Sequence, residues 1–498
     1  MPDYSLELPR RVLIAILALA AALYSTVVAA ESLLFPDDIS LRSDIQLLSD
    51  AGLLSAPVSG WPLSVSALRE EMLSVPVPLQ YQTHIREAWH RVMTRLGAAP
   101  RFKLRLAAID EPIAIRRFGD TPRGSGLRGI YQIESDTVSL RLSATLEDSP
   151  NGERETRADG SFAGFVVGAW QLSIGQVPRW WGPGYESSLI LSSNARPVPA
   201  LSLDTVTPIR FESKWLSWLG AMDWRIFAGK LEGSRFVSDA RLLGARLSLR
   251  PTRKLEIGLS RTAQWGGAGR PQDFSSFLNL LLGRDNRGDA GITLADEPGN
   301  QLAGADLRWL SPIGDAPYAV YLQMIGEDEA GGLPSRLIGM AGGEMWREFF
   351  GGSLRVYAEF ANTAVGFYKS MSLSNLAYEH YIYRSGYRYR GRSLGHAMDS
   401  DGLMLSLGAI WNRDGHGWEA VLRRIDVNKD GVAARGFHPI SVTGEDRWEL
   451  WLASRMSVLQ GQLSWGLLAE YINPASAATV IEPTAYASWE RAWGASER

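Results

Sequence analysis

Residues 138–147 read Val-Ser-Leu-Arg-Leu-Ser-Ala-Thr-Leu-Glu, and this stretch decides the fold class. Every second residue from Val138 to Leu146 is apolar and the residues between them are polar, so a β-strand here has one apolar and one polar face. The strand is about ten residues long, which is enough for a tilted strand to cross a membrane.

The same two-residue rhythm recurs along the chain, and its polar face often carries charge. A soluble sandwich would turn that face to bulk water, whereas a membrane barrel turns it to a wet lumen. Long Gly- and Asp-rich stretches such as Gly266 to Gly299 alternate with much shorter turns, so the pattern favours an antiparallel transmembrane β-barrel. The rhythm recurs in segments 222–228, 243–249, 255–259, 354–360, 403–409, 448–452 and 463–467. The charged residues on the polar face are Arg141, Arg225, Arg246, Glu256, Arg355, Glu359 and Glu449. The tryptophans available for aromatic girdles at the two membrane interfaces are Trp224, Trp309, Trp411, Trp448 and Trp465.

The composition agrees with a large β protein. The 498 residues are 45% hydrophobic and 21% charged with a net charge of −3, which supplies a core and excludes a polyelectrolyte that binds nucleic acid. Because there is no cysteine, disulfide frameworks, thiolate catalysis and cysteine-ligated metals are excluded. The 50 Gly and 18 Trp fit aromatic-rich surfaces, and no cofactor is expected.

The first 30 residues have the pattern of a cleaved signal peptide. Arg10 and Arg11 precede the apolar run Val12 to Leu23, and Val28-Ala29-Ala30 supplies the small residues of a cleavage site before Glu31. A single transmembrane anchor is the alternative, but no positive stop-transfer cluster follows the run. We therefore expect an exported protein, with the signal peptide at 1–30.

Residues 31–100 have a helical period. Leu41, Ile45 and Leu48 share one face of a first helix, and Ser64 is placed to cap a second. A third helix presents Tyr81, Ile85, Trp89, Val92 and Leu96 on one stripe and ends at Gly97. Three short helices form a bundle too small to be comfortably stable alone, so we expect it to lean on the barrel formed by residues 101–498.

One stretch resembles a known family. Residues 179–203 read Arg-Trp-Trp-Gly-Pro-Gly-Tyr-Glu-Ser-Ser-Leu-Ile-Leu-Ser-Ser-Asn-Ala-Arg-Pro-Val-Pro-Ala-Leu-Ser-Leu, which is similar to the signature of the Wzi-like capsule-assembly family of Gram-negative outer-membrane proteins. Residues 41–63, with Trp61-Pro62-Leu63, and the segment 389–402 agree with it. The resemblance extends along the chain after the signal peptide.

The resemblance implies a mainly β fold: an outer-membrane barrel of about 18 strands with extracellular loops, preceded by a small periplasmic helical bundle. It also implies a lectin-like protein, not an enzyme, that binds and anchors capsular or related exopolysaccharide at the cell surface. Lipid and lipopolysaccharide are expected neighbours, and the periplasmic helices are an expected contact for export machinery. Barrel proteins commonly finish on an aromatic residue, whereas this sequence finishes on Arg498. Either Trp493 takes the role of that aromatic residue, with a short tail beyond it, or the last strand ends earlier.

Two segments are candidates for polysaccharide binding, because aromatic faces stack on sugar C–H groups and polar side chains pair with hydroxyls. The first holds Trp180, Trp181 and Tyr185, with Asn194 and Arg196 nearby; its alternative is a lumen plug or wall anchor. The second is a Tyr/Arg cluster suited to an acidic glycan, with a solvated rim girdle as its alternative. The second cluster comprises Tyr381, Tyr383, Arg384, Tyr387 and Arg388, flanked by Tyr378, Tyr389, Arg390 and Arg392.

Three other functions are considered. Asp426, Asn428 and Asp430 match the first half of a calcium loop, but Phe437 replaces the glutamate expected at its end, and a turn at Asp430-Gly431 explains the residues more simply. A barrel that cleaves lipid or glycan could use His396 with Asp399 and a serine. Catalysis requires these side chains to be arranged against one another, and nearness in sequence does not supply that arrangement. The main competitor to a lectin is a porin or solute channel lined by the charges of the polar face.

Overall fold

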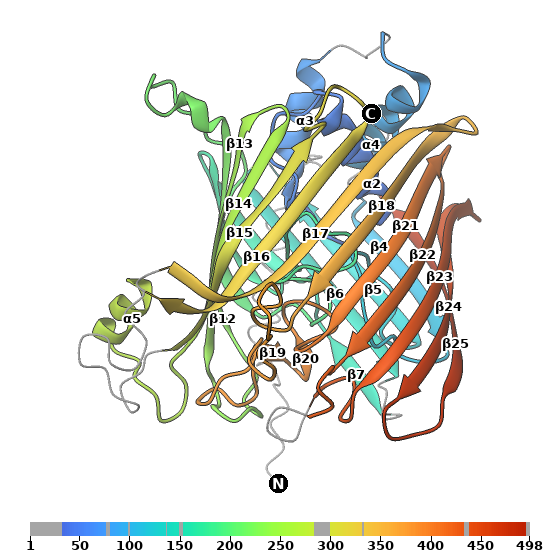
Figure 1. Cartoon of the computed structure of the whole chain (residues 1–498). Coiled ribbons are helices and arrows are strands. Elements are labelled where there is room, and N and C mark those ends of the chain that lie inside the picture. The colour runs from blue at the N-terminus through green and yellow to red at the C-terminus, as the bar shows by residue number, and fades with distance from the viewer. Residues whose placement is uncertain are drawn as a thin grey trace, which may run out of the picture.

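The computed structural model is a closed antiparallel β-barrel with three helices across one mouth (Figure 1). It describes residues 32–75, 80–97, 100–135, 137–148, 153–282, 299–330, 333–432 and 438–494. The expected signal peptide lies outside these residues. Within them, no helix is both long and apolar enough to cross a membrane.

The wall has eighteen strand positions, as the family resemblance implies. β7 and β8 share one position, because both pair with β6, one after the other. The wall strands are β4 (Phe102–Ile109), β5 (Gly126–Glu134), β6 (Val138–Asp148), β7 (Arg154–Arg157), β8 (Phe162–Val167), β9 (Trp170–Gly175), β11 (Ala200–Thr205), β12 (Ala221–Lys230), β13 (Arg241–Thr252), β14 (Leu255–Trp265), β15 (Gly299–Leu310), β16 (Tyr318–Ala330), β17 (Leu333–Phe349), β18 (Gly352–Asn362), β21 (Leu403–Arg413), β22 (His416–Val427), β23 (Glu445–Val458), β24 (Gly461–Pro474) and β25 (Val480–Trp493).

The predicted alternation sets which residues face in and out. In β6, Ser139 and Arg141 are buried in the lumen while Leu142 and Leu146 are 41% and 47% exposed on the outside. The outward side chains of the other strands are likewise exposed and apolar, as a wall that faces lipid requires. They include Leu172, Ile174, Ile226, Leu259, Leu322, Leu405, Leu407, Leu422, Leu450 and Leu467, together with Trp309 and Trp448.

The barrel closes between the last strand and the first. β25 pairs with β4 from Tyr486 opposite Ile109 to Trp493 opposite Phe102, and the last two rings lie 5.5 Å apart. The strand therefore ends at Trp493, the first of the two alternatives that the sequence left open.

The three predicted helices are α2 (Ile39–Asp50), α3 (Val65–Ser74) and α4 (Thr83–Gly97). Asp38 caps α2 by accepting the Leu41 N–H at 2.9 Å, and Ser64 caps α3 by accepting the Ala67 N–H at 3.3 Å. Their apolar sides form one core with barrel residues, which confirms that the small bundle rests on the barrel.

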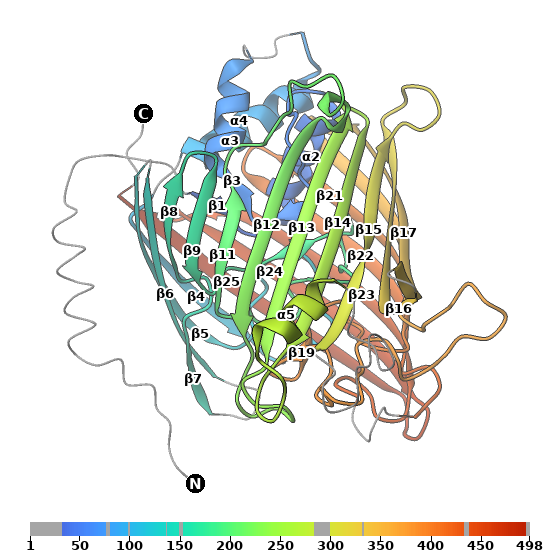
Figure 2. The same cartoon turned by 90° about the vertical axis from the view of Figure 1, so that its left-hand side faces the viewer.

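The two mouths of the barrel differ, as Figures 1 and 2 show. At the mouth covered by the helices, strands are joined by turns such as 168–169, 253–254 and 459–460. At the opposite mouth the connections are long, among them 110–125, 176–199 and 363–402. We call these the short-turn mouth and the long-loop mouth. Asp430-Gly431 lie in a turn, closed by the Gly431 N–H donating to the Asn428 carbonyl at 2.9 Å, and this turn begins the long connection 428–444 between β22 and β23.

Charged side chains of the lumen are paired with one another. Arg246 is fully buried and binds Asp306 through two contacts of 2.6 and 3.0 Å. Arg355 binds Glu344 at 2.6 Å, and Arg423 lies between Glu186 and Glu449. Such pairing offsets the cost of removing charges from water.

Candidate functional site

The Trp-Trp-Gly-Pro-Gly segment packs inside the barrel against the N-terminal region. Its strand β10 (Trp180–Trp181) pairs with β2 (Gly60–Trp61), and both tryptophans have 0% exposure. The Trp180 ring meets the Phe118 ring edge-on at 5.1 Å, and Phe118 meets Trp61 at 5.2 Å. Segments far apart in sequence thus form one aromatic core within the lumen.

Tyr185 is fixed just as tightly. Its hydroxyl donates to Glu344 Oε2 at 2.6 Å and its ring stacks on Tyr357 with centroids 4.5 Å apart. Burial raises the pKa of this hydroxyl, so it remains a donor. Arg42 from α2 lies 4.5 Å from the centre of the same ring and donates to the Pro183 carbonyl at 2.6 Å.

Asn194 and Arg196 join neighbouring loops. The Asn194 amide donates to the Ser393 carbonyl at 3.0 Å and accepts from Arg392 at 3.2 Å. Arg196 pairs with Asp159 at 3.0 Å and also with Glu155. All five residues of this first candidate segment therefore contact other parts of the protein. Their arrangement favours the plug that was the alternative interpretation, and a role in sugar contact stays a prediction.

The Tyr/Arg cluster divides into buried and exposed members. Tyr383 and Tyr387 have 0% exposure, and their hydroxyls donate to the Gly266 and Ile190 carbonyls at 3.1 and 2.9 Å. Arg388 is also buried and binds both oxygens of Asp399. The two tyrosines thus tie the 363–402 loop to other segments, and Arg388 links two parts of the loop to each other.

Tyr381 and Arg384 point outward at the long-loop mouth. Tyr381 is 41% exposed and stacks on His380 with ring centroids 4.6 Å apart. The Arg384 guanidinium lies 4.7 Å from the ring centre of Phe236, which is 61% exposed. We call Phe236, His380, Tyr381 and Arg384 the rim patch.

Phe236 was missed by the sequence analysis. It belongs to the loop between β12 and β13, and its N–H donates to Ser385 Oγ at 2.9 Å. Because this contact links residues about 150 positions apart, no local pattern points to it.

The calcium-loop residues are engaged in the protein's own hydrogen bonds. Asn428 donates to the Ser441 and Val442 carbonyls at 3.0 and 3.1 Å, and Asp430 accepts from Asn375 at 2.7 Å. Among the described residues, no three acidic or histidine side chains are grouped so that they could hold a metal ion. Phe437 lies outside those residues.

His396 and Asp399 are not arranged as a catalytic pair. Asp399 is bound by Arg388 and by the Ser400 N–H, while His396 Nδ1 accepts the Met398 N–H at 3.3 Å. Burial lowers the pKa of His396 to about 3, so the imidazole is neutral at physiological pH. Its surroundings favour a structural role.

These features define a class of protein. A closed antiparallel barrel with an apolar outer face, a charged lumen and inward-folded loops is a plugged outer-membrane β-barrel. Among the lumen charges that resembled a channel lining, Arg225 pairs with Asp223, Glu256 accepts the N–H groups of Val58 and Ser59, and Glu359 accepts from the Tyr321 hydroxyl at 2.8 Å.

Comparisons with known proteins give the family. The family model of capsule assembly protein Wzi matches residues 100–473, about three quarters of the chain. The chain belongs to this family, and it is an outer-membrane protein.

A solved structure and a curated protein are among the relatives of the chain. Wzi from Escherichia coli, described as a carbohydrate-binding outer-membrane β-barrel involved in group 1 capsule assembly, aligns with a TM-score of 0.81 and 27% identity over 93% of this chain and 100% of that one. An uncharacterized 55.8 kDa protein in the cps region of Klebsiella pneumoniae is 34% identical over 303 residues. That match covers 60% of this chain and 59% of the relative, so the chain spans about three fifths of the relative's length.

Proposed function

We propose that this protein binds capsular or related exopolysaccharide at the long-loop mouth and anchors it to the cell surface. The observation that carries the proposal is a barrel whose lumen is filled by its own loops and whose outer mouth exposes an aromatic and cationic patch. The family match, and the description of the E. coli relative as carbohydrate-binding, support it.

The rim patch has the chemistry that a sugar chain needs. Sugar C–H groups stack on exposed aromatic faces, which Tyr381 and Phe236 provide. Arg384 supplies a guanidinium that pairs with hydroxyl or carboxylate oxygens. The buried Tyr383, Tyr387 and Arg388 hold the loop that carries the patch, and we assign them a positioning role.

The orientation of the barrel follows from its two mouths. Short turns of outer-membrane barrels face the periplasm and long loops face outward. We propose a signal peptide at 1–30, a periplasmic helical region at 31–100 and the barrel at 101–498. This division is supported by the end of α4 at Gly97 and the start of β4 at Phe102.

Two further partners belong to the proposal. Trp215 and Trp218 are 86% and 65% exposed near the short-turn mouth, where they suit the interface between lipid and water. The exposed apolar side of α5 (Phe274–Leu281) suits the same kind of interface near the long-loop mouth, where lipopolysaccharide lies. The helices at the periplasmic mouth are the surface that export machinery would meet. We propose binding without catalysis, which is supported by the separate engagements of His396 and Asp399.

The test compares cell-attached and released polysaccharide in cells that carry the wild type, no protein, or the variant Tyr381→Ala/Arg384→Ala. We expect polymer to move from cells to medium at constant total when the protein is absent, and a partial shift in the same direction for the variant. Phe350→Ala/Arg413→Ala is a matched control, because it removes an exposed aromatic and arginine at the short-turn mouth. Unchanged distribution without the protein would contradict the proposal.

A further inference from the structure

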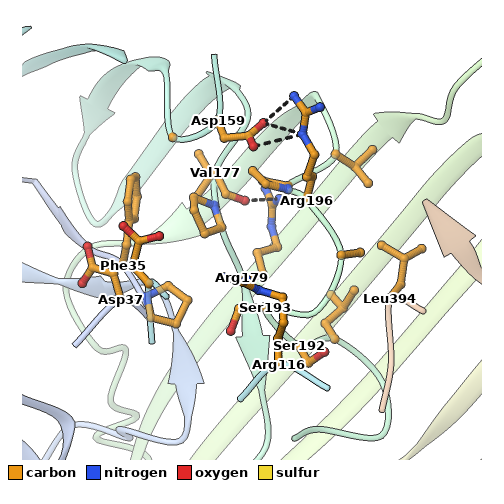
Figure 3. A pocket seen from close by; sticks show the side chains of 18 of the residues that line it. Phe35, Asp37, Arg116, Asp159, Val177, Arg179, Ser192, Ser193, Arg196 and Leu394 are labelled. Carbon is orange, nitrogen blue, oxygen red and sulfur yellow. Dashed lines mark hydrogen bonds and ion pairs between the residues drawn. The ribbon is translucent and has the colours of Figure 1, made fainter. Parts of the chain in front are cut away.

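A cavity inside the barrel lies between the N-terminal segment and two inward loops (Figure 3). The space in it that is open to water-sized molecules is about 110 Å³. Six arginines but only three aspartates line it, and apolar residues such as Leu191, Pro197 and Leu394 complete its wall. The arginines are Arg116, Arg123, Arg128, Arg141, Arg179 and Arg196, and the aspartates are Asp37, Asp120 and Asp159.

Two of the three aspartates have ion-pair partners. Asp120 binds Arg128 and also Arg105 at 2.5 Å each, and Asp159 binds Arg196 at 3.0 Å. Figure 3 shows the last of these pairs at the edge of the cavity.

Arg116, Arg123 and Arg179 have no ion pair of this kind. Asp120 acts on Arg116 and Arg123, and Asp204 acts on Arg179, only from a greater distance. Among the described residues, no carboxylate lies within 4.0 Å of any of these three guanidinium groups. Arg116 donates to the Thr121 and Pro122 carbonyls, and Arg123 donates to three carbonyls of residues 193–195. Arg179 donates to the Val177 carbonyl at 2.9 Å and to Ser202 Oγ.

Two of these three are deeply buried, since Arg116 and Arg179 are 5% and 8% exposed. Burial lowers the pKa of Arg116 to about 9 and that of Arg179 to about 10, and the charge of nearby Arg392 lowers the Arg116 value further. A buried cation held only by neutral oxygens is costly unless an anion joins it.

A second cavity provides an internal comparison. It shares Asp37, Gly119 and Asp120 with the first, but its lining has five basic and five acidic residues. Arg455, for example, is bound there to Asp38. Of these two cavities, the first has an excess of positive charge and the second does not.

We propose that the first cavity binds a carboxylate-bearing sugar residue of an acidic glycan, held by Arg116, Arg123 and Arg179. Guanidinium groups match carboxylate oxygens in charge and geometry. The apolar part of the lining suits the C–H face of a sugar ring more than a bare inorganic anion. The inference rests on the proposed function, because the sugar is taken to be a terminal or branch residue of the anchored polysaccharide.

The test titrates the full-length protein in detergent by calorimetry with a glucuronate-containing oligosaccharide and with its carboxyl-reduced neutral form. We expect the wild type to bind the acidic form about tenfold more tightly than the neutral one. Arg116→Gln/Arg179→Gln should lose this preference and bind both forms alike. Arg455→Gln, in the charge-balanced cavity, is the control and should keep the preference.

The outcomes separate the two proposals. If the wild type binds neither oligosaccharide, the proposed function fails; if it binds both equally, the proposed function stands and the charged site is refuted. An acidic-form affinity unchanged in the double variant would also refute the site, as would displacement of the oligosaccharide by inorganic phosphate but not by free glucuronate.

Folding is checked by the melting temperature, which should not fall in the double variant because uncompensated buried charge has been removed. Should that variant fail to fold, the salt dependence of wild-type binding still decides. An affinity for the acidic form that does not weaken as salt is raised would overturn the inference.

Discussion

Arg246 illustrates how single residues are placed by sequence and completed by the fold. The alternation in β13 predicted that its side chain faces the lumen, and it does, with 0% exposure. Its partners are Ser260 on β14, the adjacent strand, and Asp306 on β15, the strand after that. Periodicity determines the face of a residue, but only strand order and register determine what it meets.

Asp37 is a residue whose ionisation should be visible in the stability of the protein. Burial raises the pKa of its carboxyl from 3.8 to about 6. The positive charges of Arg95 and Arg141 oppose this rise, and the negative charges of Asp120 and Asp38 add to it. Below about pH 6 the native carboxyl holds a proton that the unfolded chain still releases. This group therefore destabilises the native state above pH 6 and does so progressively less as the pH falls.

We expect Asp37→Asn to raise the melting temperature at neutral pH, where the wild-type carboxyl is charged. The gain should shrink as the pH is lowered from about 7 to about 5, since other groups titrate alike in both proteins. Thermal unfolding of both proteins across this range measures the difference. A constant difference at every pH would contradict the assignment.

At the scale of elements, α2 connects the helical region to the wall through one carboxylate. Asp50 accepts from Arg308 on β15 at 2.6 and 3.0 Å and from Arg355 on β18 at 3.3 Å. Both arginines also bind Glu344 on β17. The end of α2 and three strands thus share one buried network, in which loss of a member leaves charges uncompensated.

Asp50→Ala should lower the free energy of unfolding by about 3 kcal/mol, because two buried guanidiniums lose a carboxylate. Denaturant unfolding in detergent gives the value, and Asp414→Ala, an exposed carboxylate at the same mouth, is the control. Equal stabilities of the two variants would show that Glu344 alone suffices for both arginines.

At the scale of the whole molecule, the lumen distinguishes an anchoring protein from a channel. The barrel is wide enough in strand number to be open, yet the loops 110–125, 176–199 and 363–402 and the helices meet inside it. Phe118 and Trp180 come from two of these loops and share one buried cluster with Trp61 of β2, which lies between α2 and α3 in the chain.

We expect the wild-type protein to give no steady conductance in planar bilayers, since its own side chains occupy the path. A general porin reconstituted under the same conditions is the positive control. Steady ohmic steps from the wild type would mean that the loops leave a continuous water path and would favour the channel alternative.

The sequence by itself determined the class of fold and the three helices. It also narrowed the end of the last strand to two alternatives, of which Trp493 was one. Alternation from Val138 to Leu146, the cap at Ser64 and the stop at Gly97 are signals carried by residues within a few positions of each other. The family signature at 179–203 likewise lies in one continuous stretch.

Only the tertiary structure decided which candidate residues are accessible. Trp180, Trp181 and Tyr185 are buried against Phe118, Phe227 and Tyr357, respectively, while Tyr381 and Arg384 are exposed beside Phe236. It likewise decided that Arg196 has a carboxylate partner whereas Arg116 and Arg179 have none. The physical reason is that burial and ion pairing depend on contacts between distant segments, and these contacts exist only once the barrel has closed around its loops.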